Sequence, residues 1–194
     1  MRKVALLIDG GNLRALSLSA KKTYNPDLIE RVAHACVGEG EELLRALYYD
    51  CAPHVGTTKL PVSGDPYEFK GSDAWLHDLA SRELFAIRLG VLKFRGWKPK
   101  KTPPIGGILT DEDFKPDFEQ KGVDMRIGLD IATLASTRAV ERIVLITADT
   151  DFIPAMKHAR INGLQVAAVE LPGGNLTREF LAHVDIRRRV NWPA

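Results

Sequence analysis

The chain has 194 residues and a formal net charge of +2, which suits one domain with a full hydrophobic core. Its apolar share of 45% and charged share of 27% are ordinary for a soluble globular protein. No stretch approaches the roughly 18 apolar residues of a membrane helix, and the short apolar run near the start, which leads into a charged turn, does not predict a signal peptide.

The two cysteines, Cys36 and Cys51, form no C-x-x-C motif. We expect both to be buried free thiols rather than a disulfide, which fits a cytoplasmic protein.

The first half of the chain alternates between strand and helix patterns. Residues 3–9 (KVALLID) predict a buried strand ended by a tight turn. Residues 25–37 predict a helix with Asn25 as its N-cap and a proline at its first position. Residues 42–51 predict a second strand, whereas the Pro-, Gly-, Ser- and Thr-rich residues 53–71 predict a loop.

The middle of the chain continues the alternation. Residues 72–84 predict a helix and residues 85–94 a third strand. Residues 95–121 are rich in proline and lysine and predict a long, mobile connection with a functional role. Residues 121–136 predict a helix, and the apolar residues 141–147 a fourth strand.

The last third adds a helix at 151–163, a fifth strand at 164–171 and a final helix at 175–184. Strands that alternate with helices predict a mainly parallel sheet with helices on both faces. Neither an internal repeat nor a second domain is evident, so we expect one domain over residues 1–194.

Three aspartates follow predicted strands that should be neighbours. Asp9 ends the first strand, while Asp149 and Asp151 come just after the fourth. In open parallel sheets, ligand sites form beyond the carboxyl ends of the strands, at the point where the strand order reverses. A doubly wound order makes the first and fourth strands adjacent there, so these three carboxylates are expected to converge.

The helix predicted at 121–136 contributes two more acids. Asp124 and Asp130 lie near the two edges of its apolar arc rather than on the solvated face. Both carboxylates are therefore expected near the core side of the helix, at the same end of the sheet as the other three.

Five clustered carboxylates would repel one another and raise their own pKa values, unless a divalent cation lay among them. Ligands that offer only oxygen atoms suit Mg²⁺ or Mn²⁺. Such ions activate water and stabilise the oxyanions of phosphoryl transfer. The expected metal ligands are Asp9, Asp124, Asp130, Asp149 and Asp151, and the first four are the expected catalytic residues.

Each acid also has a structural interpretation. Asp9 and Asp149 could begin turns, and Asp124 and Asp151 could cap helices. Asp130, in mid-helix beside apolar residues, is the hardest to explain this way. The metal hypothesis is preferred because all five positions agree with one geometry.

The turn DGGN at residues 9–12 excludes two other phosphate chemistries. It lacks the second acid of the D-x-D motif of haloacid-dehalogenase phosphatases, and it is not the G-x-G-x-x-G of a dinucleotide fold. Asn12 could begin a helix or orient a ligand through its amide. Lys121 could be a solvated lysine or meet a phosphate.

The motifs together resemble the NYN domain family, a branch of the PIN-like nucleases that includes LabA-like bacterial proteins. The matching segments are LLIDGGNL (6–13), KGVDMRIGLDIATLA (121–135), VLITADTDFIPAM (144–156) and LTREFLAHVD (176–185). The resemblance implies a PIN-like three-layer α/β/α sandwich, an acidic metal site and RNA hydrolysis. It places Asp9, Asp124, Asp130, Asp149 and Asp151 at the metal, with Asn12 beside them. Ala148 departs from the family's usual glycine.

RNA is the expected partner, and a homodimer is left open. The stretch KFRGWKPKK (93–101) is basic and could hold backbone phosphates, with Trp97 stacked on a base. The alternative is a solvated loop with a packed tryptophan. The expected RNA-binding residues are Asn12, Lys93, Arg95, Trp97, Lys98, Lys100, Lys101 and Lys121.

The sequence therefore predicts a ribonuclease that depends on Mg²⁺ or Mn²⁺. One rival is a module that binds RNA or protein without catalysis, which would gain nothing from five acids. The other is a phosphatase for a small molecule, against which the long basic connection argues.

Overall fold

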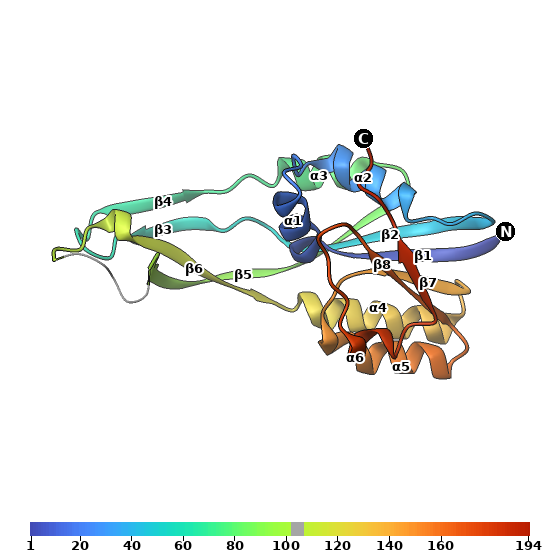
Figure 1. Ribbon diagram of the computed structural model, residues 1–194. Helices are drawn as coiled ribbons and strands as arrows, with labels where there is room; N and C mark the ends of the chain where they lie inside the picture. Colours follow the sequence, from blue (N-terminus) through green and yellow to red (C-terminus); the bar gives the residue numbers. More distant parts are fainter. Residues whose placement is uncertain (102–106) are drawn as a thin grey trace.

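A seven-stranded sheet lies between two layers of helices in the computed structural model, which describes residues 1–101 and 107–194 (Figure 1). The strand order is β6-β5-β2-β1-β7-β8-β9, and all neighbours are parallel except the antiparallel pair β5 and β6. The strands are β1 (Arg2–Asp9), β2 (Glu41–Cys51), β5 (Phe85–Pro99), β6 (Phe114–Lys121), β7 (Arg142–Ile146), β8 (Gln165–Glu170) and β9 (Ile186–Arg189). The predicted α/β class and the neighbouring positions of β1 and β7 are both confirmed.

The helices divide between the two faces of the sheet (Figure 1). One layer holds α1 (Gly10–Ser19), α2 (Pro26–Ala35) and α3 (Ala74–Ser81). The other holds α4 (Val123–Thr137), α5 (Ile153–Ile161) and α6 (Arg178–Leu181). Every helix in the described part of the chain is too short or too polar to span a bilayer.

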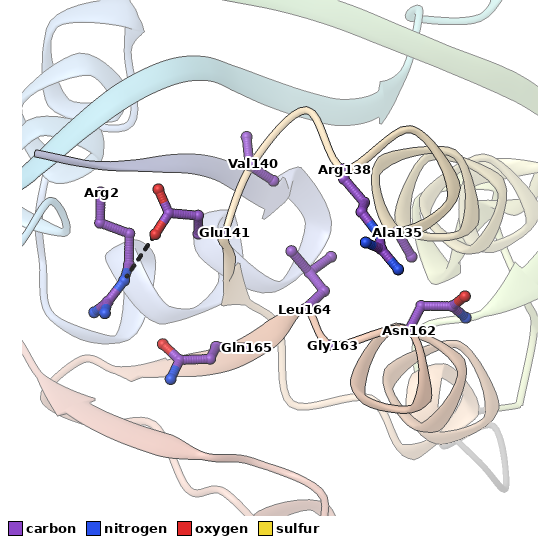
Figure 2. Close-up of a pocket in the computed structure, with 9 residues that line it drawn as sticks. All are labelled: Arg2, Ala135, Arg138, Val140, Glu141, Asn162, Gly163, Leu164 and Gln165. Carbon is purple, nitrogen blue, oxygen red and sulfur yellow. Dashed lines mark ion pairs between the residues drawn. The ribbon is translucent and has the colours of Figure 1, made fainter.

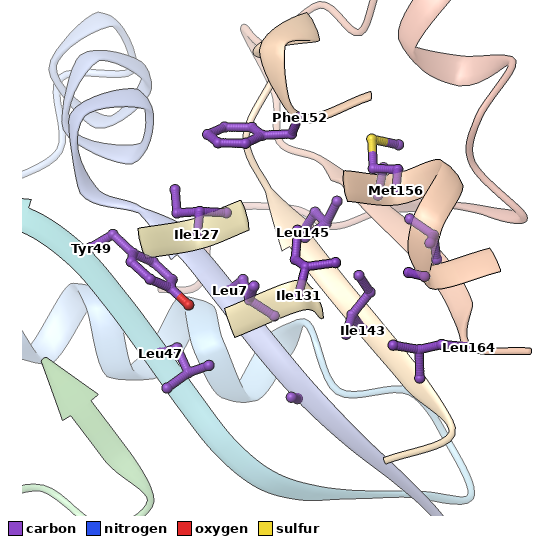
Figure 3. Packing of buried hydrophobic residues seen from close by; sticks show 14 of the residues in the cluster. Leu7, Leu47, Tyr49, Ile127, Ile131, Ile143, Leu145, Phe152, Met156 and Leu164 are labelled. Carbon is purple, nitrogen blue, oxygen red and sulfur yellow. The ribbon is translucent and has the colours of Figure 1, made fainter. Parts of the chain in front are cut away.

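The central strands contain long apolar runs because helices cover both of their faces. In β1, the run from Val4 to Ile8 is buried, and so is all of β7. Alternate residues of each strand then enter different halves of the core. Leu7 and Leu145 face the α4 and α5 layer, where they pack with Ile127, Ile131, Phe152 and Met156 (Figure 3). Leu6 and Ile8 face the α1 and α2 layer instead.

Capping explains where two of the helices begin. Asn25 accepts a hydrogen bond from the backbone N–H of Leu28 at 2.9 Å, and Pro26 opens α2, as predicted. The helix α1 was not predicted; it begins at Gly10, directly after β1, with Asp9 as its N-cap. Gly10 fits this close turn because a Cβ there would lie 2.4 Å from the Tyr48 hydroxyl and 2.7 Å from the Tyr49 carbonyl oxygen.

Two hairpins form an arm that projects beyond the helical layers (Figure 1). The loop predicted at 53–71 contains β3 (Val55–Lys59) and β4 (Pro66–Lys70), which pair with each other. The connection predicted at 95–121 is largely the outer part of β5, the short 3-10 helix Asp111–Asp113 and β6; residues 102–106 lie outside the described part. The sequence predicts loops in both segments because they are rich in turn-forming residues and contain no long apolar run.

Aromatic rings hold the two hairpins of the arm together. Phe69 of β4 lies 5.1 Å from Phe94 and 5.4 Å from Phe118, measured between ring centroids. Trp97 stacks on Phe69 at 6.0 Å and donates its indole N–H to the Lys59 carbonyl oxygen at 2.8 Å. A bulge in β5, between Phe94 and Gly96, lets rings 94 and 97 share one face of the hairpin.

Cys36 and Cys51 are free and buried, as expected.

Candidate functional site: an acidic cluster at the carboxyl edge of the sheet

Asp9 lies at the carboxyl end of β1, where its side chain is held by neighbours on two elements. One carboxylate oxygen accepts a hydrogen bond from the Asn12 backbone N–H at 3.0 Å, which caps α1. The other accepts one from the Thr147 hydroxyl at 3.1 Å, at the end of β7. Burial raises the pKa of Asp9, and the charge of Asp124 raises it further, while both hydrogen bonds oppose this effect.

Asp124 lies in the first turn of α4 and is exposed. Its pKa is raised first by partial burial and then by the negative charges of Asp149 and Asp151. Asp124 also raises the pKa of Asp9. Its charge therefore interacts with an acid at the end of β1 as well as with the acids that follow β7. The negative charges of Asp124, Asp149 and Asp151 therefore oppose one another's ionised forms.

Asp149 follows β7 and holds the turn that leads to α5. Its carboxylate accepts a hydrogen bond from the Asp151 backbone N–H at 2.9 Å, and its own N–H donates to the Thr147 hydroxyl at 3.2 Å. One carboxylate oxygen of Asp149 therefore stabilises a turn, which is the structural role that the sequence also allowed. Asp151 itself is exposed at the start of this turn.

The oxygen-only donor set fits Mg²⁺ or Mn²⁺ in chemistry and charge. Within residues 1–101 and 107–194, no three His, Cys, Asp or Glu side chains converge closely enough to enclose an ion. Magnesium does not require such an enclosure, because it keeps several waters and commonly binds through one or two carboxylates and substrate phosphates. Asp124 is coupled electrostatically to Asp9, Asp149 and Asp151, so these four carboxylates form the candidate donor set.

Asp130 makes contacts within the fold that the sequence did not predict. Its carboxylate accepts hydrogen bonds from the Tyr49 hydroxyl at 2.8 Å and from Arg88 Nε at 3.1 Å. Asp130 therefore serves as an acceptor that joins α4 to β2 and β5.

Thr147 is the residue of this site that sequence reasoning overlooked. It is buried and contacts both Asp9 and the Asp149 backbone, so it links the ends of β1 and β7. Its position at the head of TADTDF was the available signal.

Asn12 lines a cavity of about 200 Å³ next to the acidic cluster. Thr147, Ala148 and Gly174 contribute to the same cavity, and the Asn12 backbone is the part that contacts Asp9. The side-chain amide of Asn12 is therefore available to a ligand at this edge.

Several of the predicted RNA-binding residues make contacts within the arm. Arg95 and Lys121 both pair with Glu119, each at 3.2 Å, and Lys98 pairs with Asp117. Trp97 is half-buried and packed among Phe69, Phe94 and Tyr67, as in the packed-tryptophan alternative, and its stacking on a base stays a prediction. In the described part of the chain, the exposed Lys93, Lys100 and Lys101 form no ion pair.

A second polar pocket, of about 440 Å³, lies at the opposite edge of the sheet (Figure 2). It is lined by residues at the amino ends of β1, β7 and β8, including Glu141, which pairs with Arg2 at 3.5 Å, and Gln165. Because parallel sheets bind ligands at the carboxyl edge, and the acids lie there, this pocket is not the candidate site.

The sheet order, the two helical layers and the acids at the carboxyl edge define a PIN-like α/β fold. A crystal structure of a protein of unknown function from Vibrio parahaemolyticus is similar, with a TM-score of 0.55 at 17% sequence identity. The match covers 97% of this chain and 92% of that one, and it supports the fold alone. No curated protein matches this chain.

Residues 92–185 match the NYN domain family. This segment contains Asp124, Asp149 and Asp151, and the match confirms the resemblance to NYN domains. The LLIDGGNL motif and Asp9 lie before it, on the neighbouring strand of the same sheet. The NYN domain indicates a nuclease-like function related to RNA, and proteins of this class typically use divalent metals.

Proposed function

We propose that this protein is a ribonuclease that hydrolyses RNA phosphodiester bonds with Mg²⁺ or Mn²⁺ at the acidic edge of its sheet. The observation that carries the proposal is the mutual repulsion of the acids: Asp124 raises the pKa of Asp9, while Asp149 and Asp151 raise that of Asp124. Carboxylates that repel one another at one edge of the sheet suit the binding of a divalent cation.

Asp9 and Asp124 would hold the ion, and Asp149 and Asp151 would contribute charge and bind its waters. When bound, the ion would supply an activated water and neutralise the charge that develops on the phosphate. Thr147 keeps the Asp9 carboxylate oriented through its 3.1 Å hydrogen bond. No role is proposed for Asp130 at the metal.

The RNA backbone would run toward this site along the arm. Lys93, Lys100 and Lys101 would contact phosphates, and Arg95, Lys98 and Lys121 could join them by exchanging their present carboxylate partners. The Asn12 amide would meet the substrate beside Asp9. We also propose that the protein acts in the cytoplasm, and its oligomeric state is a separate question.

The test uses Asp9→Asn. Asparagine is an equally good N-cap, so the variant can keep the hydrogen bond from the Asn12 N–H while losing the charge. We expect wild type to cleave mixed RNAs in Mn²⁺ but not in EDTA, and Asp9→Asn to lose at least ~10²-fold in rate. Near wild-type turnover by the folded variant would remove Asp9 from the mechanism.

The rival function is a non-catalytic NYN module that binds RNA or protein. It is favoured by one observation: the acids of the described chain do not enclose an ion. RNA that binds with Mn²⁺ and remains intact, at the protein concentrations that saturate binding, would support this rival.

A further inference from the structure

A crevice of about 510 Å³ lies where the arm joins the helical layer. Its walls come from two parts of the molecule that are distant in sequence. Body and arm contribute Arg14, Tyr24, Trp75, Pro53, Leu92 and Gln120. The volume is within the range of pockets that bind small organic ligands.

The crevice opens beside the acidic cluster. Gln120 lines it, and its side-chain oxygen lies 3.8 Å from the position that a Cβ on Gly11 would occupy. The same position lies 3.4 Å from a carboxylate oxygen of Asp9. Tyr24, on the other wall, donates its hydroxyl to the Gly10 carbonyl oxygen at 3.2 Å. A chain bound at Asp9 therefore passes the mouth of the crevice.

The crevice presents aromatic rings that are fixed in place. Trp75 meets Tyr24 edge to face at 6.2 Å and Tyr48 at 6.0 Å, measured between centroids. Pro53 and Leu92 supply apolar surface from the arm. Flat rings with apolar walls and a few polar groups at the rim suit a planar heterocycle, because unstacked bases bind by stacking on aromatic side chains.

A cation at the rim is held by a buried acid. Asp50 is 1% exposed and accepts hydrogen bonds from Arg14, from the Tyr48 hydroxyl at 2.9 Å and from the Cys51 N–H at 2.8 Å. Arg14 also lies over the Tyr24 ring, 5.3 Å from its centroid. The guanidinium has five N–H donors, so several stay available to the edge of a base or to a phosphate.

We propose that this crevice binds one unpaired RNA base next to the phosphate held at the acidic cluster, so that the protein selects single-stranded RNA. The inference rests on the proposed function of that cluster. A base inside a duplex is stacked and paired, so it cannot enter this crevice without leaving the helix. Single strands and loops are thus the substrate class.

The first experiment uses Trp75 as a fluorescent probe. The chain has three tryptophans, so Trp97→Phe with Trp192→Phe leaves Trp75 alone. In Ca²⁺, which can occupy an oxygen-lined site in place of Mn²⁺, pentaribonucleotides with bases should quench its emission in a saturable way. An abasic pentaribonucleotide and a closed RNA duplex should not. Equal binding of the abasic strand, or equal quenching by the duplex, would overturn the inference.

The second experiment measures binding of labelled single-stranded RNA in Ca²⁺ by anisotropy. Trp75→Leu should weaken it about tenfold, within the range expected for one stacked base. Gln120→Trp should have a similar effect by filling the mouth, and this exposed position leaves the core untouched. Trp192→Phe is the control. Wild-type affinity in Gln120→Trp would contradict the proposal even if Trp75→Leu fails to fold.

Cleavage assays separate the two proposals. If wild type never cleaves RNA but the base-dependent quenching persists, the ribonuclease proposal fails and the base site stands. If cleavage depends on Asp9 but abasic RNA binds as well as normal RNA, the base site fails and the ribonuclease proposal stands.

Discussion

Replacing Asp130 with alanine tests whether this residue holds α4 against the sheet or serves the metal. The change removes the acceptor of the Tyr49 hydroxyl, on a residue that is fully buried. A buried hydroxyl left without a partner costs about 1–3 kcal/mol. The Arg88 partner is 41% exposed, so its loss adds little. We therefore expect a loss of about 2 kcal/mol in the free energy of unfolding.

The assay is urea denaturation in EDTA, followed by circular dichroism. With a slope of about 2 kcal/mol per molar urea, the midpoint should fall by about 1 M. Asp124→Ala is the matched control on the same helix, and it should change the free energy by less than about 0.5 kcal/mol because Asp124 is exposed.

Thermal melting in Mn²⁺ should show the larger defect in Asp124→Ala rather than in Asp130→Ala. A ligand at a hundredfold excess over its Kd stabilises the folded state by about 2.7 kcal/mol. Asp130→Ala should keep this gain and Asp124→Ala should lose much of it. A wild-type urea midpoint for Asp130→Ala, combined with loss of the Mn²⁺ gain, would refute the structural assignment of Asp130.

Three other predictions concern charge and packing. The pKa of Asp124 is raised in the folded protein, so its ionisation opposes folding at pH values above the pKa of the unfolded chain. Asp124→Asn should therefore melt at a higher temperature than wild type at about pH 7 in EDTA. This difference should vanish below about pH 3.8. A difference that persists in acid would contradict this. Replacing Lys93, Lys100 and Lys101 with alanine should flatten the slope of log K against log salt for single-stranded RNA by about two, at roughly 0.7 per contact. As a control, the same change at Lys3, Lys21 and Lys157 should leave the slope unaltered. Gly10→Ala should lower the free energy of unfolding by about 1–3 kcal/mol through overpacking against Tyr48. Gly128→Ala, which has open space at its Cβ, should raise it by about 0.4–1 kcal/mol. Similar urea midpoints for the two variants would contradict the contacts at Gly10.

The parallel sheet was predictable because the amino-acid composition of its strands is distinctive. Residues 4–8 and 142–146 are buried on both faces, so their apolar runs are continuous and short, and few other structures produce that pattern. The arm was not predictable in the same way. Its strands bury only the aromatic face, and Phe69, Phe94 and Phe118 meet across two hairpins whose pairing no local pattern specifies.

The candidate site was predictable where a strand end fixed the position of an acid. Asp9 and Asp149 follow paired strands, so their approach depends only on the sheet order. Helical periodicity placed Asp130 near the core side correctly, but it could not reveal that Tyr49 and Arg88, from two other strands, reach it there. Side chains that meet through tertiary packing carry no mutual signal in one sequence.

The two outermost strands of the large sheet bear on how this protein meets copies of itself. In β6, Pro116 lacks a backbone N–H, and charged side chains surround it; β9 has only four residues, three of them arginine. Glu170 and Glu41 draw those arginines back onto the protein. Short, charged and proline-containing edges resist pairing with another strand. The outer edges of the large sheet therefore disfavour pairing with a strand from a second chain.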